Sequence, residues 1–442
     1  MVRVNRSGLL YVLALGSCAF LLFQLHYYRK YVTKAGPRLL NADNQWQTVR
    51  SFLSGAHTCH VPVFLIDVSV LNSISHNAPG HHNCNFLCSR PITAFGLNAK
   101  LWSHDASSCF LAALEQKDFS WTLSSGEDPR LVGLDVSGDQ VPLHLLLRRH
   151  GNVIQLVFFV ERGGGFLWHG ALRLRPDQDR TFPFRLLDYG RHQGAYDRPE
   201  LVLTVLDGLD VRVPRNVTHF LLEQRHAHFL ECGYRDAHSF LQLYPQDSSS
   251  AALDFRRKVQ TLLQISVRTL GQIQVPFWIS SGTCLGWLRQ CEVISYSRDV
   301  DIGIFVQDFR PEIVQVLTRA GLQLKHRFGK VEDSLELSFL LDDVKLDVFF
   351  FYDDGQFMWN GGTQARTGRK FKYVFPRFSL CWTMFLELKV RVPCETLDYV
   401  RANYGDGWSV PTVTWDWKTS PSNVLNNGVW PVDQWEELIQ VF

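Results

Sequence analysis

The sequence predicts an α/β protein in which one N-terminal transmembrane helix precedes a mixed α/β domain and a nucleotidyltransferase-like α/β domain. Three observations lead to this prediction. An uncharged apolar run covers residues 9–25, strand-like segments separated by turn residues fill residues 46–244, and amphipathic helices alternate with apolar strands over residues 251–352. Such alternation is typical of α/β sheets, and 442 residues are enough for two domains.

The apolar run is long enough to cross a bilayer, and it is flanked by Arg3 and Arg6 before it and by Arg29 and Lys30 after it. A cleaved signal peptide is the alternative, but no small-x-small cleavage site ends the run. We therefore expect a cytoplasmic tail over residues 1–7, a signal anchor over 8–28 and a stem over 29–45. The remainder of the chain would then lie in the lumen.

The overall composition indicates a folded chain without a strong electrostatic field. Apolar residues make up 46% and aromatic residues 13%, which favours packed domains over disorder. Lys and Arg number 45 against 43 Asp and Glu. This near balance speaks against nucleic acid as a partner, so any bound phosphate must be held by local groups.

Cysteines and a glycosylation motif agree with a lumenal body. Nine of the ten cysteines follow the apolar run, and an oxidising compartment would pair them as disulfides. Because nine is odd, at least one must stay free or pair between chains. Asn216 begins an Asn-Val-Thr acceptor motif for N-glycosylation.

The first globular region, residues 46–244, reads as a mixed α/β domain. Its strand-like runs cover residues 61–68, 141–147, 153–160, 201–205 and 219–222. The polar segment 243–250, with one Pro and three Ser, is the predicted domain boundary. The residues of this region carry no sign of its role, which could be acceptor recognition, subunit pairing or binding of a partner enzyme.

The second region, residues 251–442, reads as an α/β sheet domain. We expect helices over residues 251–270, 284–291 and 311–320, and strands over residues 275–279, 300–306, 335–341 and 345–352. The chemically informative residues lie on these elements.

Asp299 and Asp301 occupy alternate positions at the start of an apolar strand, so both carboxylates project from one face. Two carboxylates at that separation repel, and Mg²⁺ or Mn²⁺ would relieve the repulsion. The alternative is that both residues cap a turn or pair with Arg289 and Arg298.

Asp347 places one carboxylate in the apolar run 345–352. A buried carboxylate is costly unless it is paired or ligated. Asp347 could therefore be a third metal ligand on a neighbouring strand, or it could form an ion pair with Lys345 or Lys325.

Ser281, Gly282 and Thr283 lie between a predicted strand and a predicted helix, where free N–H groups can bind phosphate. Arg289 follows in the helix as a fixed positive charge. The alternative is an ordinary helix N-cap.

Two other groups are weaker candidates. His81, His82, Cys84 and Cys88 could bind zinc, but their spacing fits no standard finger and disulfides are favoured. An aromatic cluster could line a sugar site, although a packing role in the core is favoured because large rings dominate buried area. Its members are Trp408, Trp415, Trp417, Trp430 and Trp435.

The motifs above resemble the signature of the LicD-type nucleotidyltransferase-fold family over residues 275–351. The resemblance implies that Asp299, Asp301 and Asp347 hold a divalent metal as catalytic residues, with Gly282, Thr283 and Arg289 binding substrate. LicD members transfer phosphate-linked alcohols from a CDP-activated donor.

Further stretches, such as 20–25, 276–278, 330–337 and 415–418, resemble vertebrate members of this family over the whole chain. They imply a single-pass type II enzyme of the Golgi membrane, with the endoplasmic reticulum as a second location. It would transfer ribitol 5-phosphate from CDP-ribitol to the O-mannosyl glycan of α-dystroglycan, with other ribitol-phosphate or O-mannosyl glycan enzymes as partners. A noncatalytic Golgi scaffold or chaperone for those enzymes is the alternative, and a nucleotidyltransferase that makes an activated sugar or alcohol is a third reading.

Overall fold

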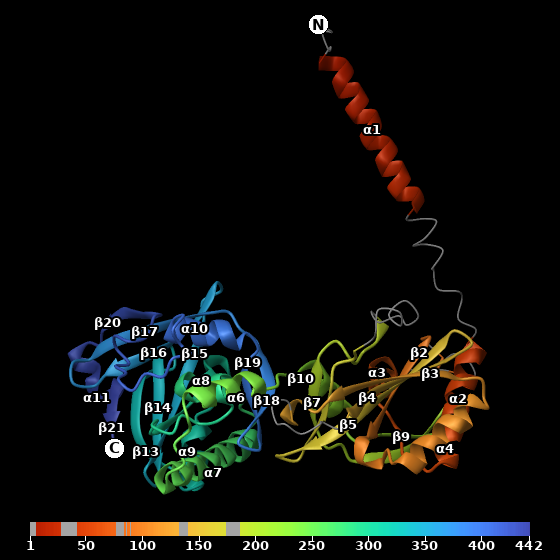
Figure 1. Cartoon of the computed structure of the whole chain (residues 1–442). Coiled ribbons are helices and arrows are strands. Elements are labelled where there is room, and N and C mark those ends of the chain that lie inside the picture. The colour runs from red at the N-terminus through yellow and green to blue at the C-terminus, as the bar shows by residue number, and fades with distance from the viewer. Residues whose placement is uncertain are drawn as a thin grey trace.

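The protein is described from a computed structural model that covers residues 6–27, 42–76, 84, 86–88, 90–131, 140–173 and 186–442. After helix α1 (Arg6–Tyr27), the chain forms two α/β bodies with separate hydrophobic cores, which lie side by side in Figure 1. The predicted α/β class is confirmed.

Helix α1 coincides with the apolar run of the sequence, and its side chains over residues 15–26 are exposed. Within the described parts of the chain, no helix combines the length and hydropathy needed to cross a membrane. Residues 1–5 and 28–41, and the side chains of residues 6–14, lie outside what the structure describes. The tail, the anchor over 8–28 and the stem stay predictions.

The N-terminal body is built on a ten-stranded sheet in the order β1-β2-β5-β6-β7-β10-β18-β19, with β3 and β4 added through β5. Its N-terminal strands are β1 (Phe64–Leu65), β2 (Ile92–Asn98), β3 (Ser120–Glu127), β4 (Gln140–Arg149), β5 (Asn152–Arg162), β6 (Phe166–His169), β7 (Gln193–Asp197) and β10 (His228–Phe229). Strand β5 is buried along almost its whole length, as its apolar sequence predicts.

Four helices and a hairpin complete this body. They are α2 (Ala42–Thr58), α3 (Val68–Ser75), α4 (His104–Glu115), α5 (Val217–Arg225) and the pair β8 (Leu201–Leu206) and β9 (Leu209–Pro214). The predicted strands at 141–147, 153–160 and 201–205 are confirmed.

Two predicted strands were wrong because side-chain caps start helices there. Over residues 61–68 only Phe64 and Leu65 pair as a strand, since the Asp67 carboxylate accepts from the Val70 N–H and begins α3. Over residues 219–222 the chain is α5, because the Asn216 side chain accepts from the His219 N–H. In both cases the apolar run was too short to distinguish the helical period from the strand period.

The C-terminal body contains a nine-stranded sheet in the order β20-β17-β16-β15-β14-β13-β21, to which β12 and β11 are added through β15. The strands are β11 (Trp278–Ile279), β12 (Asp299–Phe305), β13 (Gln323–Lys330), β14 (Asp333–Leu341), β15 (Val344–Asp353), β16 (Phe357–Gln364), β17 (Arg369–Pro376), β20 (Val424–Val429) and β21 (Ile439–Val441). The predicted strands at 300–306, 335–341 and 345–352 are confirmed, and the one at 275–279 is shortened to β11.

Helices α7 (Ser250–Gln272), α8 (Ser281–Gln290), α9 (Glu312–Arg319), α10 (Thr396–Tyr404) and α11 (Trp435–Leu438) belong to this body. The first three match predicted helices, although α8 begins earlier than expected, so Ser281, Gly282 and Thr283 form its first turn. The core gathers around Trp278, which is fully buried among Phe305, Phe351 and Phe378.

The two bodies are joined by shared structure as well as by the predicted boundary, a loop between α6 (Tyr234–Leu243) and α7. Hairpin β18 (Leu380–Phe385) and β19 (Leu388–Pro393) leaves the C-terminal body and pairs through Trp382 with Phe229 of β10. Helix α6 packs on α8, and a disulfide joins Cys232 to Cys291. Residues on both sides of the boundary therefore hold the bodies together.

Eight cysteines form disulfides, namely Cys59–Cys109, Cys84–Cys88, Cys232–Cys291 and Cys381–Cys394. Cys284 remains free and buried, which confirms that at least one cysteine after the apolar run stays unpaired. Cys18 lies in α1.

Candidate functional site

The register between two parallel strands creates the candidate site. Strand β12 pairs with β15 so that Asp301 lies opposite Asp347 and Asp299 lies opposite Lys345. Because side chains two residues apart share a face, Asp299 joins the same cluster. Carboxylate oxygens of the three aspartates lie within 4.8 Å of one another. The structure thus brings together the three carboxylates that the sequence singled out.

Asp301 is fixed from three directions by the first turn of α8 and the residue before it. Its Oδ2 accepts from the Gly282 N–H at 3.1 Å, and its own N–H donates to the Thr283 hydroxyl at 2.9 Å. The Ser280 N–H donates to the Asp301 carbonyl at 2.9 Å. Gly282 and Thr283 therefore position the central carboxylate.

The two outer carboxylates also have partners. Asp347 accepts from the Ser338 hydroxyl at 2.5 Å and pairs with the Lys345 ammonium at 2.8 Å. Asp299 accepts from the Ser297 hydroxyl at 2.8 Å. The predicted alternative of a Lys345–Asp347 ion pair is thus present together with the carboxylate cluster.

The electrostatics of the site disfavour a full set of negative charges. Burial raises the pKa of Asp301 well above its ordinary value, and the neighbouring Asp299 and Asp347 carboxylates raise it further. Burial likewise raises the pKa of Asp347, against the opposing effect of Lys345. Burial opposes charge on Lys345, yet Asp347, Asp299 and Glu336 together raise the lysine pKa to about 12.

These residues fit a divalent cation. Carboxylate oxygens are the ligands that Mg²⁺ and Mn²⁺ prefer, and three of them face one point with a single ammonium to balance them. A bound cation would reverse the electrostatic penalty on Asp301 and Asp347.

A small, shallow hollow opens beside the carboxylates at the start of α8. Its lining includes Gly282 and Thr283 of α8, Asp299 and Ser297 at the start of β12, and Phe255 of α7. The N-terminus of a helix carries partial positive charge. An anionic group entering this hollow would therefore meet the helix end and the carboxylate site together.

Arg289 does not join this arrangement. It is buried near the C-terminal end of α8, where its guanidinium donates to the Gln290 side chain and lies 4.9 Å from the Phe240 ring centroid. Seven residues of helix separate it from Gly282, a rise of about 10 Å. The structure assigns Arg289 packing contacts with α6.

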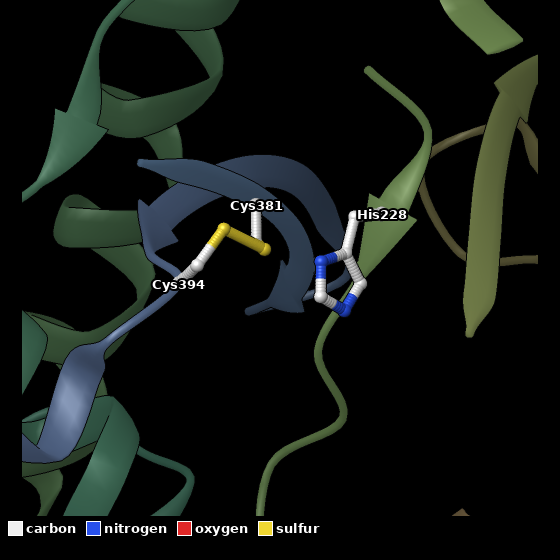
Figure 2. A group of neighbouring side chains, drawn as sticks. All are labelled: His228, Cys381 and Cys394. Carbon is white, nitrogen blue, oxygen red and sulfur yellow. A yellow bond between two sulfur atoms is a disulfide. The ribbon is translucent and has the colours of Figure 1, made fainter. Parts of the chain in front are cut away.

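Two further groups of metal-ligand type involve disulfides. His228 lies beside Cys381 and Cys394, but Figure 2 shows that the two sulfur atoms are bonded to each other, so neither offers a thiolate. Cys84 and Cys88, near Asp207, are joined in the same way, as the sequence favoured. His81 and His82 lie outside the described residues.

A fourth group, Asp197, His219 and Glu223, already has a cation of its own. The Lys389 ammonium lies 2.8 Å from Asp197 and 3.7 Å from Glu223. The Lys389 ammonium thus offsets much of the negative charge of Asp197 and Glu223 without a metal.

Sequence reasoning missed three residues around the carboxylates. Ser297 and Ser338 orient Asp299 and Asp347. Tyr404, at the end of α10, extends its hydroxyl toward Gly282: a Cβ built on Gly282 would lie 3.8 Å from that oxygen and 3.5 Å from Asp301 Oδ2. Only the pairing of β14 with β15 could have revealed Ser338, which lies opposite Asp347.

The members of the predicted aromatic cluster do not share one environment. Trp408 and Trp435 are half-buried. Trp430 is buried and donates to Thr363, as the favoured core role requires. Trp415 and Trp417 are 43% and 41% exposed, so the core role was wrong for them. Asn216, the predicted glycosylation site, is exposed and caps α5.

Two family models match the chain. Residues 1–260 match the family model described as Fukutin N-terminal, and residues 274–395 match the LicD/FKTN/FKRP nucleotidyltransferase domain. The proteins named Ribitol-5-phosphate transferase FKTN in Mus musculus and Homo sapiens are each 49% identical over 463 aligned residues, covering 100% of both chains.

More distant relatives were also found. An uncharacterized Caenorhabditis elegans protein, W02B3.4, is 25% identical over 411 residues, covering 90% of this chain and 86% of its own. Among solved structures, a lincomycin-bound lincosamide antibiotic adenylyltransferase is 18% identical and covers 31% of this chain and 82% of its own, with a TM-score of 0.22. That structural likeness is too small to carry an argument.

Proposed function

The chain belongs to the fukutin family, and from that premise we propose that it is a ribitol-5-phosphate transferase. The proposed donor is CDP-ribitol. The proposed acceptor is the O-mannosyl glycan of α-dystroglycan, a phosphorylated core M3 glycan that ends in N-acetylgalactosamine. The observation that carries the proposal is the strand register that unites Asp299, Asp301 and Asp347 beside the start of α8.

In the proposed reaction an acceptor hydroxyl oxygen bonds to the phosphorus that carries ribitol, and the bond from that phosphorus to CMP breaks. Mg²⁺ or Mn²⁺ held by the three aspartates would supply positive charge against the donor pyrophosphate and the departing CMP. Gly282 and Thr283 keep Asp301 in place and present the helix N-terminus to the hollow. Asp347 either shares the cation or accepts the proton of the hydroxyl group.

The proposed location is the Golgi membrane, with residues 8–28 as a signal anchor and the catalytic body in the lumen. Two observations support this. Most described side chains of α1 are apolar, and Phe20 and Leu22 among them are 61% and 68% exposed. The four disulfides suit an oxidising compartment.

A transfer assay tests the function. The full-length chain in detergent is given CDP-ribitol, Mn²⁺ and an O-mannosyl glycopeptide ending in N-acetylgalactosamine, and the product is identified by mass spectrometry. We expect transfer by the wild type and by the exposed control Asp433→Ala, and a loss of at least about a hundredfold for Asp301→Ala. Full activity of a folded Asp301→Ala chain would contradict the proposal. If the wild type binds no CDP-ribitol, with or without Mn²⁺, the noncatalytic scaffold would be favoured.

A further inference from the structure

Two exposed tryptophans lie on one short turn beside the carboxylate site. Trp415 and Trp417 flank Asp416 in the segment between α10 and β20, and their side chains are 43% and 41% exposed. Together the two rings leave a pair of apolar surfaces in water at neighbouring positions of one turn.

The turn is rigidly built. The Asp416 carboxylate accepts from the Lys418 N–H at 3.1 Å and from the Thr419 hydroxyl at 3.1 Å, and the Asp416 carbonyl accepts from the Ser420 N–H at 2.8 Å. On the sheet side, the Tyr373 hydroxyl donates to the Trp417 carbonyl at 2.9 Å. These hydrogen bonds hold the backbone of the turn that carries both tryptophans, which lowers the entropy cost of binding a ligand there.

Tyr404 connects this turn to the carboxylates. Its ring packs on Trp415 with centroids 4.8 Å apart and an interplanar angle of 34°. Its hydroxyl reaches the space over Gly282, where a built Cβ would lie 3.8 Å from the Tyr404 oxygen and 3.5 Å from Asp301 Oδ2. A single aromatic ring therefore separates Trp415 from the central carboxylate.

The hollow beside α8 has a different lining. It includes Phe255, Ser297 and Gly282, and none of its lining residues belongs to the tryptophan turn. Two surfaces therefore meet at Gly282. The hollow lies at the helix N-terminus, whereas the turn presents flat apolar faces, which suit the C–H face of a sugar ring.

We propose that Trp415 and Trp417 bind the carbohydrate acceptor by stacking against its sugar rings, with Asp416 as a positioning residue that holds the turn. This inference rests on the proposed transferase function and adds the acceptor side of the site to it. The occupant is the glycan and not the peptide that carries it, because both exposed side chains of residues 415–417 are aromatic rings, which stack on sugar faces.

Titration and kinetics with the full-length chain test this assignment. The probe for binding is the O-mannosyl glycopeptide ending in N-acetylgalactosamine, titrated without donor. For Trp415→Ala we expect the acceptor Kd and KM to rise about tenfold, a loss of roughly 1.4 kcal/mol, with the CDP-ribitol KM changed less than about twofold. Trp417→Ala should behave similarly, and Trp415→Phe, which keeps a ring, should retain most of the affinity.

The control is Trp121→Ala, which removes a 39% exposed tryptophan from β3 of the N-terminal body and should leave both KM values unchanged. Unchanged acceptor binding in folded Trp415→Ala and Trp417→Ala would overturn the inference, and so would equal binding of the peptide without its glycan. A failure of the transferase proposal looks different, because the wild type itself would then show no transfer.

Discussion

The Lys345 ammonium lies 2.8 Å from Oδ2 of Asp347, next to the two other carboxylates of the cluster. Lys345 is opposite Asp299 in the β12–β15 register. The positive charge of Lys345 therefore lies beside three carboxylates. A lysine and a divalent cation would compete for the same carboxylate oxygens. The effect of Lys345 on metal affinity can therefore be measured without any substrate.

Replacing the lysine should weaken the metal-free protein and strengthen metal binding. In EDTA, Lys345→Met should lower the free energy of unfolding by about 1 kcal/mol, less than for a fully buried pair because the lysine side chain is 41% exposed. Because the competing ammonium is gone, Mn²⁺ affinity should rise about fivefold. Calorimetric titration and thermal unfolding with and without Mn²⁺ measure both effects.

The matched control is Lys258→Met, which removes a lysine paired with Asp254 and Asp343 on the surface. It should not alter Mn²⁺ affinity. Equal Mn²⁺ affinity of Lys345→Met and the wild type would show that the cation does not use the Asp347 carboxylate.

Most elements over residues 251–352 could be predicted from the sequence, whereas β13, the elements after residue 353 and the assembly of the site were not predicted. Long amphipathic or apolar segments such as α7 and β15 have a clear period, so they were predicted correctly. Asp299 and Asp301 share a strand, so their common face followed from period two. The register that sets Asp347 opposite Asp301 is a long-range property, which no local pattern determines.

Some features of the structure escaped prediction for the same reason. Hairpin β18–β19 adds to the sheet of the other body, although about 150 residues separate its Trp382 from its neighbour Phe229. Tyr404 reaches the site through the packing of α10 on α8. Arg289 was expected near the phosphates, but it lies at the other end of α8. Helical spacing alone does not show which end of the helix faces the site.

The pKa of Glu336 predicts a pH dependence of stability. Burial and the nearby Asp347 carboxylate raise this pKa from 4.5 to about 8. The folded chain then binds more protons than the unfolded chain between these values, so the free energy of unfolding falls as pH rises from about 4.5 to about 8. The slope due to this one group is at most about 1.4 kcal/mol per pH unit.

Glu336→Gln should flatten that part of the pH profile, because an amide does not titrate. Urea unfolding in EDTA at several pH values between 5 and 8 measures the slope. Glu436→Gln, at an exposed position of α11, serves as the control and should leave the profile unchanged. An identical profile for Glu336→Gln would exclude the proposed protonation.

Gly303 allows the carboxylate strand to pass close to the core. A Cβ at Gly303 would lie 2.3 Å from Cε2 of Trp278, which is fully buried. Gly303→Ala should therefore lower the free energy of unfolding by about 2 kcal/mol, since the packed indole cannot move away. Because β12 also carries Asp301, the Mn²⁺ affinity of Gly303→Ala should fall as well.

Gly271→Ala is the matched control, because no atom lies within 4 Å of a Cβ built at this position in α7. In a helix this substitution should stabilise by about 0.5 kcal/mol. Urea unfolding compares the two variants. Equal stabilities would mean that β12 can move away from Trp278 without cost.

The Cys232–Cys291 disulfide holds the segment before α6 against the end of α8. Its cysteines are 59 residues apart, and closing a loop of that length stabilises by about 4 kcal/mol in the chain-entropy estimate. The Cys84–Cys88 disulfide spans 4 residues, and the same estimate gives about 2 kcal/mol. Thermal unfolding of the two double Cys→Ser variants should show the larger loss for Cys232 and Cys291. The reverse order would show that strain or residual structure dominates.

Asn216 combines a structural role with a predicted glycosylation site. Its Oδ1 accepts from the His219 N–H at 3.0 Å as the N-cap of α5. Thr218→Ala removes the acceptor motif and leaves this cap, whereas Asn216→Gln removes both. In secretory cells both variants should lose the mass shift on endoglycosidase treatment.

After glycan removal from the wild type, only Asn216→Gln should be less stable, by about 1 kcal/mol, because a lost N-cap leaves helix N–H groups without a partner. Asn216→Asp provides the converse control, since aspartate caps a helix equally well and carries no glycan. Because N-glycans are added in the lumen, a mass shift in the wild type also places the body there. A shift that persists in Thr218→Ala would assign the glycan to another site, and no shift in the wild type would leave Asn216 as a cap alone.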